Sequence, residues 1–213
     1  MKQQSKGHSL LLKGVATIAI LGALVVAPGI ASAAKDGGGS AGAPDINVQP
    51  VAKLKKGGTF VWATTQLCDN YNTNHVDGNF AGCSYLMNGL LPGTFYTDAK
   101  GAFQIDKNYF TDIKLTSTKP QTLTYTVNPK AKWSDGKPIS LADFVGYWKA
   151  LNGSNEAYEV VSTTGYEDIE SVTKGASSNQ IVVKFKNVYA DWQGLFGGLL
   201  PASVTATPTA FNT

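Results

Sequence analysis

The stretch of residues 122–151 constrains the fold of this chain most, because it predicts a strand, a turn and a capped helix in succession. Residues 122–127 alternate between polar and apolar side chains, a pattern typical of a strand with one buried face. Ser140 stands three residues before Asp143, as in a capping box with Asp in place of Glu or Gln. The apolar side chains that follow recur at helical spacing, at Leu141, Phe144, Val145, Trp148 and Leu151. An Asn-Gly pair at residues 152–153 predicts the end of the helix.

Short alternating segments on either side predict β-hairpins. The three predicted hairpins join residues 94–97 with 103–105, 113–117 with 122–127, and 166–173 with 180–185. Residues 58–64 predict a further strand, while residues 79–90 and 191–196 each predict a short helix. Residues 211–213 show no signal for a cap or a terminal element. Strands that alternate with single helices predict a mixed α/β architecture.

The first 33 residues predict an export signal. Three lysines and no acidic residue precede an apolar run at residues 14–26, and an Ala-Ser-Ala triplet at residues 31–33 supplies the small side chains that signal peptidase requires. The apolar run is shorter than the roughly 20 residues of a membrane-spanning helix. An uncleaved membrane anchor is the alternative. No Cys lies near the cleavage site, so a lipid-anchored form is not expected.

The part that follows the signal has a neutral charge balance. Residues 34–56 are rich in Gly, Ala, Ser, Asp and Pro and predict a flexible linker, and residues 57–213 are long enough for one domain. Because three of the 18 basic residues lie in the signal, 15 lysines face 15 acidic residues in the remainder, and Arg is absent. Without basic clustering, no nucleic-acid partner is expected.

Two cysteines, Cys68 and Cys83, predict a disulfide, because an exported protein with an even number of cysteines tends to pair them. A metal site or a pair of free thiols is the alternative. His75 is the only His outside the signal and no C-x-x-C spacing occurs, so neither alternative is favoured and no metal is expected.

A search for catalytic groups finds none. No nucleophile elbow, phosphate-binding loop or dinucleotide fingerprint occurs, and no Ser or Cys stands in a recognisable arrangement with His75. The chain is therefore predicted not to be an enzyme and to need no cofactor. A secreted hydrolase is an alternative that would require a nucleophile and a base.

Polar side chains follow the first predicted strand. Thr64 and Thr65 end that strand, and Asn70, Asn72 and Asn74 lie in the loop after it. Because ligands of open α/β sheets bind beyond the carboxyl ends of strands, these five residues are the predicted ligand-binding positions. The alternative is a polar loop without a ligand. Alanine at position 72 or 74 is expected to weaken ligand binding without unfolding the protein.

Several collinear segments resemble a known family. They are residues 56–62, 123–144, 165–169 with 181–185, and 190–202. The central segment carries Trp133-Ser134-Asp135-Gly136 and then a helix that opens Ala-Asp-Phe, which looks like the signature of the family 5 extracellular solute-binding proteins. The Ser-Asp-Gly part has turn chemistry, so we interpret this motif as architectural and not as a binding site.

The resemblance implies a two-lobed fold of the type II periplasmic-binding-protein kind, with only part of the first lobe present in an N-terminal fragment. It implies capture of peptides outside the cell, in the cleft between the lobes, as the substrate-binding component of an ABC transporter. The implied partners are a peptide and the permease and ATPase subunits at the plasma membrane, and a monomer is expected. Within the same fold, a nickel complex, haem or an oligosaccharide is the alternative ligand.

Overall fold

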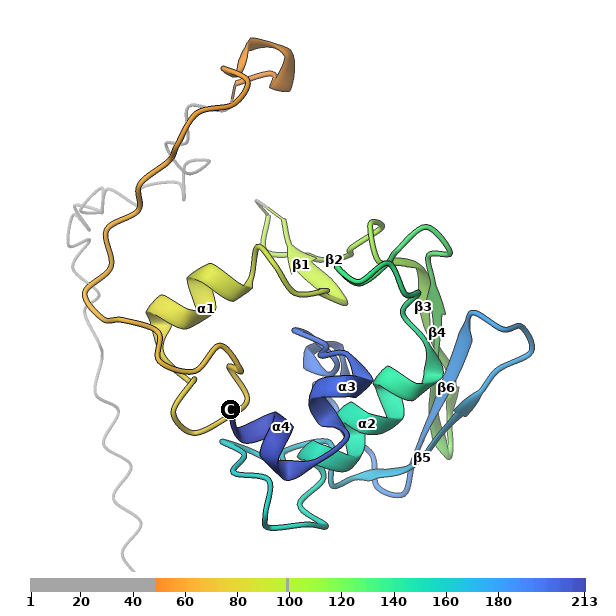
Figure 1. Cartoon of the computed structure of the whole chain (residues 1–213). Coiled ribbons are helices and arrows are strands. Elements are labelled where there is room, and N and C mark those ends of the chain that lie inside the picture. Colours follow the sequence, from red (N-terminus) through yellow and green to blue (C-terminus); the bar gives the residue numbers. More distant parts are fainter. Residues whose placement is uncertain (1–48, 99) are drawn as a thin grey trace, which may run out of the picture. The chain divides into compact units, whose positions relative to one another are not determined.

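The computed structural model describes residues 49–98 and 100–213, which belong to one compact unit (Figure 1). The predicted export signal at residues 1–33 lies outside the described residues, as does most of the predicted linker at residues 34–56. A short 3-10 helix, η1 (Val51–Lys53), falls within the rest of that linker. Among the described residues, no helix combines the length and the apolar character needed to cross a membrane.

The main structural element is an antiparallel four-stranded sheet in the order β3-β4-β6-β5. Its strands are β3 (Phe110–Thr118), β4 (Gln121–Val127), β5 (Ile169–Lys174) and β6 (Gln180–Phe185). A separate two-stranded hairpin consists of β1 (Phe95–Thr97) and β2 (Phe103–Ile105). The three predicted hairpins are thereby confirmed, although β5 begins at Ile169, three residues later than expected.

One face of the sheet is buried because its strands alternate. In β4 every second side chain is buried and the intervening ones are half-buried, and β6 follows the same pattern. Helix α2 (Leu141–Leu151) contacts β5 and β6, and α3 (Ala202–Thr205) packs against α2 (Figure 1). The core therefore lies between the sheet and α2, as the alternation predicts.

The buried face of α2 is centred slightly away from the predicted stripe. Phe144 and Leu151 are fully buried as expected, whereas Leu141, Val145 and Trp148 are only half-buried. The other buried positions of the helix are Asp143, Tyr147 and Ala150. The face turns toward Tyr147 because the rings of Tyr166 and Phe196 contact it there.

Helices α2 and α3 approach closely at Gly146. A Cβ atom added at Gly146 would collide with Oγ1 of Thr205, a buried residue of α3. Only a residue without a side chain therefore permits this approach with Thr205 in place.

Phe196 is the centre of an aromatic cluster. Its ring contacts those of Tyr125, Phe144, Tyr147 and Tyr166 at centroid distances of 4.8–6.0 Å. Its φ of 57° lies in the left-handed region, which is unfavourable for a bulky residue. The backbone N–H of Phe196 donates to the hydroxyl of Tyr166 at 2.8 Å, so this hydrogen bond and the ring contacts hold the strained conformation.

Two fully enclosed tyrosine hydroxyls in this cluster predict opposite mutational effects. The Tyr125 hydroxyl has no hydrogen-bond partner among the described residues, and burial raises its pKa. Tyr125→Phe is expected to increase the free energy of unfolding by about 1 kcal/mol, because it removes an unsatisfied polar atom. Tyr166→Phe is expected to decrease it by about 1–2 kcal/mol, because Phe196 loses its acceptor. Urea denaturation measures both, and a stability loss in Tyr125→Phe would contradict the prediction.

The prediction of a strand at residues 58–64 is wrong. This segment forms no strand, and the side chains of Phe60, Val61 and Trp62 are 83%, 84% and 68% exposed. A strand requires a neighbour to accept and donate its backbone hydrogen bonds, and no described segment pairs with it. The local sequence, a short apolar run after a Gly pair, was therefore insufficient to define a strand.

The remaining helices are short. Helix α1 (Ala81–Met87) forms within the predicted 79–90 segment, and the segment at 191–196 contains a single 3-10 turn, η2 (Trp192–Gly194). The expectation of no terminal element was wrong, because α4 (Pro208–Asn212) forms there. Its start is a Thr cap followed by Pro: the Thr207 side chain accepts from the N–H of Ala210 at 3.2 Å.

Candidate functional site

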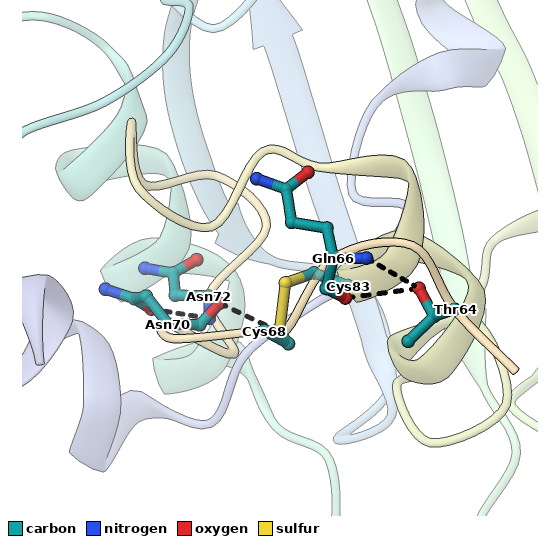
Figure 2. The surroundings of a disulfide bond; sticks show 6 residues. All are labelled: Thr64, Gln66, Cys68, Asn70, Asn72 and Cys83. Atoms are coloured by element: carbon teal, nitrogen blue, oxygen red, sulfur yellow. Dashed lines mark hydrogen bonds between the residues drawn. A yellow bond between two sulfur atoms is a disulfide. The ribbon is translucent and has the colours of Figure 1, made fainter.

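The loop before α1 carries most of the predicted ligand-binding residues. Cys68 and Cys83 form the predicted disulfide, which ties the start of this loop to α1 (Figure 2). Cys83 is fully buried, and the disulfide sulfur of Cys68 lies 3.3 Å from the backbone oxygen of Asn70. The disulfide therefore fixes the loop directly beside Asn70.

Asn70 and Asn72 are buried, each 6% exposed, and their amide groups bond within the protein. Each side-chain oxygen accepts from the backbone N–H two residues later, at 2.8 Å for Asn70 and 3.1 Å for Asn72. Each side-chain nitrogen donates to the backbone of α4, to Asn212 oxygen at 3.1 Å and to Phe211 oxygen at 2.9 Å. These residues join the loop to α4, and a direct ligand contact by either stays a prediction.

Asn74 is more open to a ligand. It is half-buried and lines a hollow of about 260 Å³ together with Tyr166 and Gly197. The nearby Tyr147 hydroxyl donates to the backbone oxygen of Gly197 at 3.1 Å. Burial raises the pKa of Tyr147 to about 12, and hydrogen bonds with Asn74 and Tyr166 oppose that shift. The hydroxyl is therefore a neutral donor at physiological pH.

Thr64 and Thr65 are exposed and lie away from Asn74's hollow. The Thr64 hydroxyl donates to the backbone oxygen of Gln66 at 3.1 Å (Figure 2). Thr64 lines a different hollow of about 490 Å³, where Trp62 stacks on Tyr85 at 6.0 Å between ring centroids. The predicted residues are thus distributed over separate hollows and do not form one cluster.

His75 is held by its neighbours. It is 2% exposed, and its Nδ1 accepts from the N–H of Asp77 at 3.0 Å. Its Nε2 lies 3.3 Å from a carboxylate oxygen of Glu159. Within residues 49–98 and 100–213, no group of three or more His, Cys, Asp or Glu side chains could hold a metal ion.

Residues of the Trp-Ser-Asp-Gly segment line a further hollow that the sequence did not predict. Its volume is about 550 Å³, and the predicted residues Asn70 and Asn72 line it together with Lys132, Trp133 and Ser134. Sequence reasoning missed these residues because their turn chemistry explains their presence without a ligand. The signal that the sequence offered was a Lys next to a Trp, at positions 132 and 133.

Relatives of known identity match the chain over most of its length. No family model matches it. It is 46% identical over 171 residues to the oligopeptide-binding protein OppA of Mycobacterium tuberculosis, across 79% of this chain and 29% of that protein. It is 32% identical over 121 residues to LpqW of Mycobacterium tuberculosis, described as a probable monoacyl phosphatidylinositol tetramannoside-binding protein, across 54% of this chain and 19% of that protein.

Solved structures share the fold. The periplasmic EDTA-binding protein EppA superposes with a TM-score of 0.62 at 28% identity, over 66% of this chain and 26% of that chain. The chain belongs to the family 5 extracellular solute-binding proteins. The oligopeptide-binding protein AppA from Bacillus subtilis, solved with a nonapeptide, superposes with a TM-score of 0.54 at 17% identity, over 64% of this chain and 26% of that chain, and shows the fold alone.

The predicted fold class of this solute-binding protein is therefore confirmed. Its neighbours are type II periplasmic binding proteins, and the chain contains part of one lobe of that fold. It spans about 29% of the length of the OppA relatives that it matches.

Proposed function

We propose that this chain belongs to a solute-binding protein that captures peptides outside the cell and delivers them to an ABC importer. The observation that carries the proposal is the 46% identity over 171 residues with the oligopeptide-binding protein OppA. The permease and ATPase subunits of the importer are the proposed partners. The proposed location is the cell surface or the periplasm, which the predicted export signal supports, and the proposed state is a monomer.

A second candidate keeps the fold and changes the ligand. EppA, at 28% identity, is described as binding EDTA, and this supports a small polycarboxylate or its metal complex as the solute. A nickel complex, haem or an oligosaccharide belongs to the same alternative. These ligands would use the same fold, so the choice depends on a binding measurement.

Calorimetric titration of the full chain with a mixture of di- to pentapeptides tests the proposal. Asn74→Ala is expected to weaken peptide binding about fivefold. The substitution removes a side-chain amide that lines the hollow beside the Tyr147 hydroxyl, and its hydrogen bond to a peptide would contribute about 1 kcal/mol. Asn72→Ala is expected to lower the free energy of unfolding by about 2 kcal/mol, because the backbone oxygen of Phe211 and the N–H of Asn74 lose their partners.

The unfolding free energy of each variant separates the two effects. Asn74→Ala should unfold at the same urea concentration as the unsubstituted chain. A response to EDTA, to nickel complexes or to sugars, with none to any peptide, would overturn the peptide assignment. Unchanged peptide affinity in folded Asn74→Ala would remove Asn74 from the predicted site.

A further inference from the structure

The side chains of residues 58–64 alternate between two sides, although the segment forms no strand. Phe60, Trp62 and Thr64 line the hollow of about 490 Å³ beside α1, whereas Val61 and Ala63 do not. Successive side chains that point to opposite sides are typical of an extended backbone, as in a β-strand. The segment is therefore arranged like the strand that its sequence predicts, and what it lacks within residues 49–98 and 100–213 is a neighbouring strand (Figure 1).

One side of the segment lies against α1. The ring of Trp62 stacks on that of Tyr85, a residue of α1, with 6.0 Å between the two centroids. A Cβ atom added at Gly82, in the same helix, would lie 2.7 Å from Oγ1 of Thr64, so the glycine permits this close approach. These contacts give the segment a defined place beside α1.

The backbone of the segment has free hydrogen-bonding groups. No backbone N–H or C=O group of residues 58–64 bonds to another backbone group in the part of the chain that the structure describes. Such a row of unpaired groups is a template for pairing with a further strand. The segment can therefore accept a strand without losing a backbone hydrogen bond that it already makes.

Exposed apolar side chains gather around the same hollow. We call them the α1 apolar surface; its members are Phe60, Trp62, Leu67, Tyr71, Tyr85 and Leu86. Large apolar side chains that are exposed together on a soluble protein commonly mark a surface that packs against another. Burial of these side chains would add to the stabilisation that strand pairing supplies.

The comparison with OppA indicates which polypeptide covers this surface. The match comprises 79% of this chain, and any span of that length includes residues 58–86. It comprises only 29% of OppA, so OppA shares this region and also contains a much larger part that residues 1–213 do not match. A segment of the same polypeptide is present at a far higher effective concentration than a second molecule. The unmatched part is therefore favoured over a second copy of the chain.

We propose that residues 58–64 are a strand of the longer protein, in which a segment of the part that residues 1–213 do not match pairs with them and covers the α1 apolar surface. Residues 1–213 thus present a docking surface for the rest of their own polypeptide. This inference does not depend on the solute, so it can fail without affecting the proposed peptide capture, and peptide capture can fail without affecting it.

Hydrogen exchange followed by mass spectrometry tests the strand pairing. It compares the 213-residue chain with OppA of Mycobacterium tuberculosis. In the 213-residue chain, the backbone amides of residues 59–63 are expected to exchange about as fast as those of an unstructured peptide, because they have no backbone acceptor. The aligned amides of OppA are expected to exchange at least about 100-fold more slowly. The amides of β4, which pairs with β3 and β6, are the control and should exchange slowly in both proteins.

A substitution at Phe60 tests the covering of the apolar surface. Phe60→Ser is expected to leave the urea midpoint of the 213-residue chain unchanged, because the side chain is exposed there. Serine at the aligned position of OppA is expected to lower the midpoint, because it removes a covered apolar side chain. Leucine at the same position is the matched control and should lower the midpoint by about half as much or less, since it stays apolar. If the serine variant of OppA does not fold, hydrogen exchange of the unsubstituted proteins still decides.

Three outcomes would overturn the proposal. The first is fast exchange of the aligned amides in OppA. The second is slow exchange of residues 59–63 in the 213-residue chain: a dependence on protein concentration would identify a second copy as the partner, and slow exchange at every concentration would identify a partner within residues 1–213. The third is an unchanged urea midpoint in the folded serine variant of OppA, which would show that the α1 apolar surface stays uncovered.

Discussion

Replacement of Asp143 by alanine is expected to lower the free energy of unfolding by about 3 kcal/mol. The carboxylate is 4% exposed and accepts three hydrogen bonds. The backbone N–H and the hydroxyl of Ser140 donate to one oxygen at 2.7 and 3.0 Å, and the N–H of Ala202 donates to the other at 2.7 Å. Asp143 therefore joins the first turn of α2 to the first turn of α3, and its loss leaves three donors on half-buried residues without partners.

The matched control is Asp135→Ala, on the exposed turn before the helix. The Asp135 carboxylate accepts from the N–H of Lys137 at 2.9 Å and pairs with the Lys137 amine at 2.8 Å. Lys137 holds the pKa of Asp135 below its usual value, but solvent replaces these contacts after substitution, so a much smaller effect is expected. Equal destabilisation by the two substitutions, measured by urea denaturation, would contradict the role assigned to Asp143.

Removal of the disulfide is expected to cost about 3 kcal/mol, because closure of the 14-residue loop between the cysteines restricts the unfolded chain. The test variant combines Cys68→Ala with Cys83→Ala, so that no free thiol remains. The expected result is a lower denaturation midpoint and faster hydrogen exchange at the backbone amides of Asn72 and Asn74, which lie inside the closed loop.

A reducing agent supplies the control for this second prediction. It should lower the midpoint of the unsubstituted chain toward that of the double variant and leave the variant itself unaffected. An unchanged midpoint in the double variant would show that the asparagine bonds to α4 are sufficient to hold the loop.

Local patterns predicted the elements whose partners are close in the chain. The hairpins and α2 formed where alternation, helical spacing and the Ser140–Asp143 pair indicated them. The segment at residues 58–64 failed because a strand depends on a neighbour that its own sequence does not specify. Helix α4 was missed because Thr207-Pro208 begins a helix too short to show an apolar repeat.

The candidate site was harder to predict because it depends on long-range contacts. The type of residue in the 70–74 loop suggested polar recognition, yet Asn70 and Asn72 bond to residues 142 and 139 positions away. No local pattern predicts that a side-chain amide will donate a hydrogen bond to a backbone oxygen far away in the sequence. Trp133 is the opposite case: turn chemistry predicted the local conformation, but not that the residue lines a hollow or that its buried indole N–H has no partner within residues 49–98 and 100–213.

The contact between Gly146 and Thr205 links the evolution of these two positions. Because a methyl group at position 146 would collide with the Thr205 hydroxyl, alanine there is compatible only with a smaller or displaced residue at position 205. Across homologues, substitutions at the two positions are therefore expected to covary, with bulk gained in one helix compensated by bulk lost in the other.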